Sequence, residues 1–253
     1  MSGHSKWSTI KRQKGAADIK RGLTFTKVAN AITIAARLGG SGDPDSNPRL
    51  RAALEGARAV NMPKDNVQRA IDRGLGKLPG QTLEEVNFEG FGPGKVAFIV
   101  EGVTDNRLRT LQVVKNLFER SGGNLGGPGS VSYMFAKKGE IRVISKGGEK
   151  EDEMLELIDL GAEEVEDYNE DGKQKYLVYV QSPEVFTMGT KITQAGYGVE
   201  SQEVAFKPTQ VVEIKDSDVA KKVIEFAQKL EELDDVQKVY ANFDIPESMI
   251  SSI

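Results

Sequence analysis

The chain has 253 residues, of which 38% are hydrophobic and 28% charged, and it carries a formal net charge of −4 without any cysteine. The lack of cysteine excludes disulfides, thiolate zinc sites and thiol nucleophiles, and it fits a reducing compartment. The apolar runs are too short for a transmembrane helix, and none follows the start as in a signal peptide. We therefore expect a cytoplasmic protein of two or three domains with no membrane partner.

The charges are distributed unevenly along the chain. Residues 1–80 contain 15 Lys and Arg against 6 Asp and Glu, whereas the remainder contains 19 against 32. The two parts thus carry net charges of +9 and −13. Such asymmetry indicates a segment that binds a polyanion, attached to acidic domains.

The basic part is predicted to form a bundle of three short helices. Apolar residues recur every three or four positions from Ala16 to Leu38, which is typical of an amphipathic helix. Asn47 and Pro48 match an N-cap followed by proline at the first helical position. A turn and a third helix occupy residues 61–74.

After Pro79 the pattern changes to strands alternating with helices. β-branched and aromatic residues predict a strand at 95–103, helical spacing predicts a helix at 106–120, and residues 131–135 resemble a strand. The end of the chain is predicted to contain a strand at 210–214, a helix at 217–233 capped by Ser217, and a strand at 236–243.

The middle of the chain has the element order βαββαβ of a ferredoxin-like unit. Its strands are expected at 140–144, 163–168, 175–180 and 199–206, its helices at 151–160 and 183–195, and a hairpin turn at 169–172. The flanking segments are each too short to bury both faces of a sheet, so we expect them to pair. The predicted domains are a basic helical domain 1–78, a discontinuous α/β domain 79–135 and 207–253, and an inserted ferredoxin-like domain 136–206.

The fold class expected from these elements is α+β and multi-domain. It comprises a basic N-terminal helical bundle and two α/β sandwich domains, one of them the ferredoxin-like βαββαβ unit.

Four stretches of sequence resemble the YebC/PmpR family. They are GHSKWSTIKRQKGAADIKRG, NPRLRAAL followed by NMPKDNVQRAIDRG, EGFGPGKVAFIVEGVTDNR, and GGNLGGPGSVSYMF. That family includes bacterial proteins described as transcriptional regulators and the mitochondrial translational activator of cytochrome c oxidase. The resemblance implies a helical N-terminal domain and two α/β domains, the second discontinuous in sequence.

The candidate nucleic-acid contacts are the cations of the basic part together with the only tryptophan, since such side chains neutralise phosphates and stack on bases. These residues are Lys6, Trp7, Lys11, Arg12, Lys14, Lys20, Arg21, Lys27, Arg49, Arg51, Arg58, Lys64, Arg69 and Arg73. Arg69 and Arg73 are four residues apart, hence on one helical face. Trp7 either stacks on a base or packs on the bundle.

No motif in the sequence indicates catalysis. His4 is the only histidine, so neither a common zinc site nor a Ser-His-Asp triad is expected. The stretches GFGPG and GGNLGGPG match no phosphate-loop consensus and are interpreted as tight turns. The carboxylate runs 149–153 and 163–171 are interpreted as solvated acids. We therefore expect no catalytic residue, metal, cofactor or small-molecule substrate.

The function expected is that of a non-enzymatic, nucleic-acid-binding regulator of gene expression, in the first place a DNA-binding transcriptional regulator. A ribosome- or RNA-associated translational regulator is an alternative, because the same cations serve DNA and RNA. A protein-interaction adaptor that uses the acidic domains is a second alternative.

Overall fold

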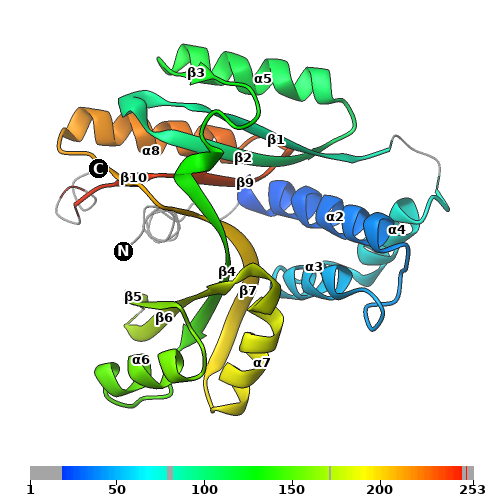
Figure 1. Ribbon diagram of the computed structural model, residues 1–253. Coiled ribbons are helices and arrows are strands. Elements are labelled where there is room, and N and C mark those ends of the chain that lie inside the picture. The colour runs from blue at the N-terminus through cyan, green and yellow to red at the C-terminus, as the bar shows by residue number, and fades with distance from the viewer. Residues whose placement is uncertain (1–18, 79–81, 171, 247–248, 250–253) are drawn as a thin grey trace. The chain divides into compact units, whose positions relative to one another are not determined.

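The computed structural model describes residues 19–78, 82–170, 172–246 and 249, with the side chains from residue 25 onward. These residues form two compact units (Figure 1). One contains residues 133–213 and 242–245, and the other contains the helical part together with the segments that precede and follow the first unit. No helix in the described ranges is long and apolar enough to cross a membrane.

The three predicted helices of the basic part are present. They are α2 (Ile19–Gly39), α3 (Pro48–Ala59) and α4 (Lys64–Gly74). The side chain of Asn47 accepts a hydrogen bond from the backbone N–H of Leu50 at 3.0 Å, which confirms the predicted cap. Ile32, Leu50 and Ile71 meet in a common core, so this part is a packed bundle.

The same unit contains a four-stranded sheet in the order β3-β1-β2-β9. Its strands are β1 (Glu84–Phe91), β2 (Ala97–Thr104), β3 (Asn124–Leu125) and β9 (Val236–Ala241). Strand β1 was not predicted, because its acids and glycine weaken the β signal. The pairing of β2 with β9 joins two segments that lie far apart in sequence.

Helices cover this sheet on both faces. α5 (Arg107–Arg120) and α8 (Ser217–Glu231) meet over one face, where Phe98, Phe118 and Phe226 form edge-to-face ring contacts. On the opposite face Ile34 of α2 packs with Leu83 and Val103. The helix cap predicted at Ser217 is wrong: Asp216 is the N-cap and accepts from the N–H groups of Asp218 and Val219.

The other unit is the predicted ferredoxin-like fold. Its elements are β4 (Phe135–Ile144), α6 (Lys150–Asp159), β5 (Glu164–Glu170), β6 (Lys173–Gln181), α7 (Val185–Gln194) and β7 (Gly198–Pro208). The antiparallel sheet has the order β5-β6-β4-β7. Leu157 of α6 and Ile192 of α7 share one core with Ile141 and Val178, so both helices pack on the same face. The α+β fold class is thereby confirmed.

The short elements differ from the prediction. Three 3-10 turns are present among the described residues: η1 (Pro93–Lys95), η2 (Ser132–Met134) and η3 (Ser182–Glu184). The turn η2 occupies most of the segment 131–135, where a strand was expected, and β4 begins only after it. The strand expected at 210–214 is reduced to β8 (Val212–Glu213), which pairs in parallel with β10 (Phe243–Asp244). The strand expected at 236–243 is therefore divided between two sheets. The division into three domains at the predicted boundaries stays a prediction.

Candidate nucleic-acid interface

Helices α2 and α4 cross closely, and the crossing positions the cations of α4. A Cβ added to Gly74 would lie 2.3 Å from the carbonyl oxygen of Thr33, so only glycine permits this approach. The hydroxyl of Thr33 donates to the carbonyl oxygens of Ala29 and Ala70, at 2.9 and 3.0 Å. The face of α4 that carries Arg69 and Arg73 is thus held at a constant place beside α2.

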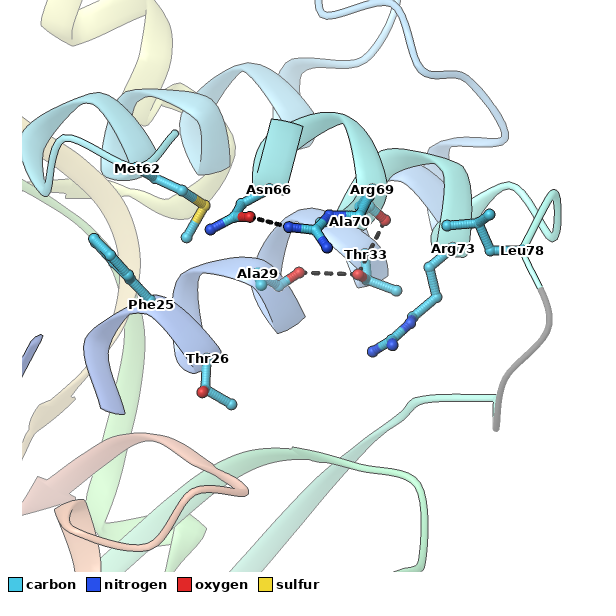
Figure 2. Close-up of a pocket in the computed structure, with 10 residues that line it drawn as sticks. All are labelled: Phe25, Thr26, Ala29, Thr33, Met62, Asn66, Arg69, Ala70, Arg73 and Leu78. Carbon is cyan, nitrogen blue, oxygen red and sulfur yellow. Dashed lines mark hydrogen bonds between the residues drawn. The ribbon is translucent and has the colours of Figure 1, made fainter. Parts of the chain in front are cut away.

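A pocket of about 320 Å³ opens beside this crossing (Figure 2). Its apolar lining consists of Phe25, Ala29, Met62, Ala70 and Leu78. Its polar lining consists of Thr26, Thr33, Asn66, Arg69 and Arg73. The pocket therefore combines an aromatic ring and aliphatic groups with two guanidinium groups.

The two arginines of the pocket differ in what they contact. Arg69 donates to the carbonyl oxygen of Asp65 at 3.3 Å and to the side-chain oxygen of Asn66. Arg73 is exposed, and its guanidinium group has no hydrogen bond or ion pair with any described residue. Arg69 is thus tethered to its own helix, whereas Arg73 is available to an anionic ligand.

The remaining predicted cations of α3 and α4 fall into two groups. Arg58 and Lys64 are exposed, and their cationic groups have no polar partner within the described ranges. Arg49 forms an ion pair with Glu85, and Arg51 donates to the carbonyl oxygens of Pro44 and Asp45, both at 3.2 Å. The first group is free to contact a phosphate, and the second maintains the local structure.

Lys27 also has a structural contact. Its ammonium group donates to the carbonyl oxygen of Glu231 at the last turn of α8. A cation at a helix C-terminus is favourable because the carbonyl groups there carry partial negative charge. Arg37, which was not predicted as a site residue, similarly donates to the carbonyl oxygen of Leu83.

Several predicted contacts fall outside the described part of the chain. Lys6, Trp7, Lys11, Arg12 and Lys14 precede residue 19. Lys20 and Arg21 belong to the start of α2, and their side chains are not among those described. The two alternatives for Trp7 therefore stay open.

Phe25 and Asn66 are pocket residues that the sequence interpretation missed. Phe25 precedes Ala29 and Thr33 at steps of four residues on α2, and Asn66 precedes Arg69 and Arg73 by three and seven residues on α4. Both spacings place the side chains on one helical stripe. This spacing could have indicated one such stripe on α2 and another on α4. It does not indicate that the two stripes pack against each other.

The glycine-rich segment 122–129 leads into a loop that encloses a carboxylate of the chain itself. Glu89 accepts hydrogen bonds from the N–H groups of Gly129, Val131 and Ser132 at 3.0, 2.9 and 2.9 Å. Burial raises the pKa of Glu89, but these backbone donors outweigh it, and the pKa lies below its ordinary value. The backbone N–H groups of this loop thus bind a carboxylate of the chain itself. This supports the interpretation of GGNLGGPG as a turn rather than a phosphate-binding loop.

The interpretation of residues 149–153 as solvated acids is wrong at one position. Glu153 is buried, with 2% of its surface exposed, and accepts from the N–H groups of Lys146 and Gly148 and from the hydroxyl of Tyr176. Its carboxylate therefore ties the start of α6 to β6. Across the described residues, no group of three or more His, Cys, Asp or Glu side chains is arranged to hold a metal ion.

Comparisons with known families cover nearly the whole chain. Residues 83–243 match a family model described as the TACO1/YebC second and third domain. Residues 5–77 match one described as the TACO1/YebC protein N-terminal domain. All the predicted cations lie within the second match. So do the pocket residues, except Leu78, which is one residue beyond its end.

Individual relatives match over their full length. A protein of Syntrophobacter fumaroxidans is 45% identical over 100% of both chains, and one of Chlorobaculum tepidum is 47% identical over 99% of this chain and 98% of its own. Both are named "Probable transcriptional regulatory protein". The crystal structure of a conserved hypothetical protein from Aquifex aeolicus matches with a TM-score of 0.82 at 42% identity, over 91% of this chain and 93% of that one.

Proposed function

Because this chain belongs to the TACO1/YebC family, we propose that it is a non-enzymatic regulator of gene expression that binds nucleic acid through its basic helical part. The resemblance inferred from the four sequence stretches is confirmed by the same matches. The names of the full-length relatives favour a role in transcription, and hence DNA as the first ligand to test.

One observation carries the proposal. Arg58, Lys64 and Arg73 are exposed on neighbouring helices, and none of their side chains has a polar partner among the described residues. Exposed cations without carboxylate partners are suited to phosphate contacts, since binding releases condensed counterions from the nucleic acid. The +9 charge of residues 1–80 supports the same interpretation.

The residues before α2 belong to the same proposal. We infer that Lys6, Lys11, Arg12 and Lys14, followed by Lys20 and Arg21, add phosphate contacts to those of α3 and α4. Trp7 would then contact a base or the bundle surface. Lys27, Arg49 and Arg51 contribute less, because their cationic groups already bind protein oxygens.

Two hydrogen-bonded acids support a non-enzymatic role. The carboxylates of Glu89 and Glu153 are occupied by backbone N–H donors, and Glu153 also by Tyr176. The pKa values of both groups are lowered, so they are ionised hydrogen-bond acceptors at neutral pH rather than proton donors. Both are best explained as structural.

The test measures the dissociation constant of the full chain for a duplex DNA and for a structured RNA between 50 and 200 mM salt. For about six phosphate contacts the affinity should fall by roughly 10³-fold over this range. The double variant Arg58→Ala, Lys64→Ala should bind more weakly and reduce the salt slope by about two, one for each lost contact.

The matched control is Lys221→Ala, Lys222→Ala, which also removes two cations from exposed helical positions, on α8. It should leave the salt slope unchanged. A flat salt profile with both ligands, or equal losses in the two double variants, would overturn the proposed interface. Tighter binding to the RNA than to the duplex would favour translational over transcriptional regulation.

A further inference from the structure

We propose that the pocket between α2 and α4 binds one unpaired nucleotide, with its base in the pocket and its phosphate on Arg73. This inference rests on the proposed function and specifies how the basic part recognises its ligand. It assigns the pocket to an extruded base, of RNA or of DNA, rather than to the surface of a regular duplex.

The apolar lining is suited to the face of a base. Phe25 is partly buried against the helical core, so its ring is held in place and one side of it lines the pocket (Figure 2). Met62 and Leu78 add polarisable and aliphatic surface to the lining. Unpaired bases are commonly bound by stacking on aromatic side chains and by contact with apolar groups.

The polar lining is suited to the edge of a base. The side-chain oxygen of Asn66 accepts from Arg69, and the amide group of Asn66 keeps its own N–H donors for a ligand. Figure 2 shows the Asn66 amide between Met62 and Arg69, on the stripe of α4 that lines the pocket. An amide in such a position can donate to a carbonyl or ring nitrogen of a base.

The charged rim is suited to the phosphate. Arg73 is exposed and lines the pocket, and its guanidinium group has no polar partner in the described part of the chain. A guanidinium group presents parallel N–H donors that match two phosphate oxygens. Arg69 adds a second positive charge one helical turn away, which favours an anion over an apolar peptide side chain.

The concave shape decides between a paired and an unpaired base. In a duplex the bases are stacked, and a protein reaches only their edges by inserting a convex helix or ribbon into a groove. A pocket of about 320 Å³ with an aromatic wall instead suits a base that has left the stack. The ligand chemistry is therefore an unpaired nucleotide in a negatively charged strand.

The experiment compares two stems of equal length, one fully paired and one with a single bulged uridine, made as RNA and as DNA. The full chain should bind the bulged stem about tenfold more tightly, as expected for one stacked base. A 5-iodouridine (5-iododeoxyuridine in DNA) at the bulge should form photo-crosslinks within residues 25–33 or 62–78. Whichever bulged stem, RNA or DNA, has the higher affinity identifies the source of the nucleotide.

Three variants assign the effect to the pocket. Phe25→Leu keeps apolar bulk but removes the ring, and it should abolish the preference for the bulge while binding to the paired stem persists. Arg73→Gln should reduce the preference and weaken the crosslink. Arg58→Gln removes another exposed charge, outside the pocket, and should weaken binding to both stems alike.

The outcomes separate this inference from the proposed function. If neither stem binds, the proposed function fails and the pocket assignment fails with it. If both stems bind with equal affinity, or if Phe25→Leu keeps the preference with a native circular dichroism spectrum, the pocket assignment is overturned while the proposed function stands. A crosslink confined to other residues would also overturn it.

Discussion

The hydroxyl oxygen of Thr33 lies 3.0 Å from the carbonyl oxygen of Ala70 and joins α2 to α4 next to the pocket. Thr33 is buried, with 4% of its surface exposed, so the bond is shielded from water. The separation of the two helices, and with it the width of the pocket, depends on this contact and on the close approach at Gly74.

Thr33→Val should lower the free energy of unfolding by about 1 kcal/mol, because valine keeps the shape but leaves the Ala70 carbonyl without its interhelical donor. Urea denaturation of the full chain measures this loss. The control is Thr190→Val, whose hydroxyl donates to the carbonyl of Phe186 within its own helix and, among the described residues, to no other element. A loss of similar size in the control would show that the interhelical bond contributes nothing.

Gly74→Ala and Gly56→Ala should change stability in opposite directions. A Cβ at Gly74 would meet the backbone oxygen of Thr33 and the side chain of Ala36, and such overpacking costs about 1–3 kcal/mol. A Cβ at Gly56 within α3 meets no atom within 4 Å, so alanine should stabilise that helix by up to about 1 kcal/mol. Thermal melts of both variants check the signs, and stabilisation by Gly74→Ala would contradict the described crossing.

Glu153→Gln should destabilise the ferredoxin-like unit at neutral pH. Burial raises the pKa of Glu153, but hydrogen bonds from the hydroxyls of Ser145 and Tyr176 and from two N–H groups outweigh it and lower the pKa. A lowered pKa means that ionised Glu153 contributes stability above its unfolded pKa and loses it as pH falls through the folded value. The expected loss at pH 7 is about 2 kcal/mol, the usual size for hydrogen bonds to a charged group.

The pH dependence provides the internal check of this prediction. The difference in unfolding free energy between the parent and Glu153→Gln should be constant at neutral pH and shrink below about pH 4.5, as the carboxylate becomes protonated. Glu151→Gln is the control, since that side chain is 75% exposed on the same helix. A difference in unfolding free energy that stays constant down to pH 3 would mean that the charge of Glu153 does not contribute to stability.

A fragment of residues 134–209 should fold without the rest of the chain. It contains the complete sheet β5-β6-β4-β7, both helices on its covered face, and the closing bond from the N–H of Thr209 to the carbonyl of Met134 at 2.8 Å. We expect one cooperative thermal transition and dispersed amide resonances. A gradual transition would show that this unit depends on the rest of the chain for its stability.

Much of the fold follows from local patterns. The spacing of apolar residues predicted α2, α3 and α4. The cap at Asn47 was predictable because an Asn side chain accepts from the first N–H groups of a helix and Pro is favoured at the first helical position. The βαββαβ order was predictable because apolar residues recur with the period of a strand or of a helix in each element, and turn residues separate the elements. Strand β1 was missed because its acids and Gly90 have low β propensity, although Val86 and Phe88 alternate with polar residues as in a half-buried strand. Glu89, on the less buried face of β1, accepts hydrogen bonds from backbone N–H groups of the 126–132 loop.

The site was predictable only in part. The excess of cations in residues 1–80 and the common face of Arg69 and Arg73 are properties of the chain itself, since charge and helical spacing do not depend on distant contacts. Which cations remain available depends on partners far away in sequence: Lys27 binds the end of α8, 204 residues later, and Arg49 binds Glu85. The pocket likewise exists only because Gly74 lets α4 approach Thr33 of α2, a contact between segments that local sequence cannot bring together.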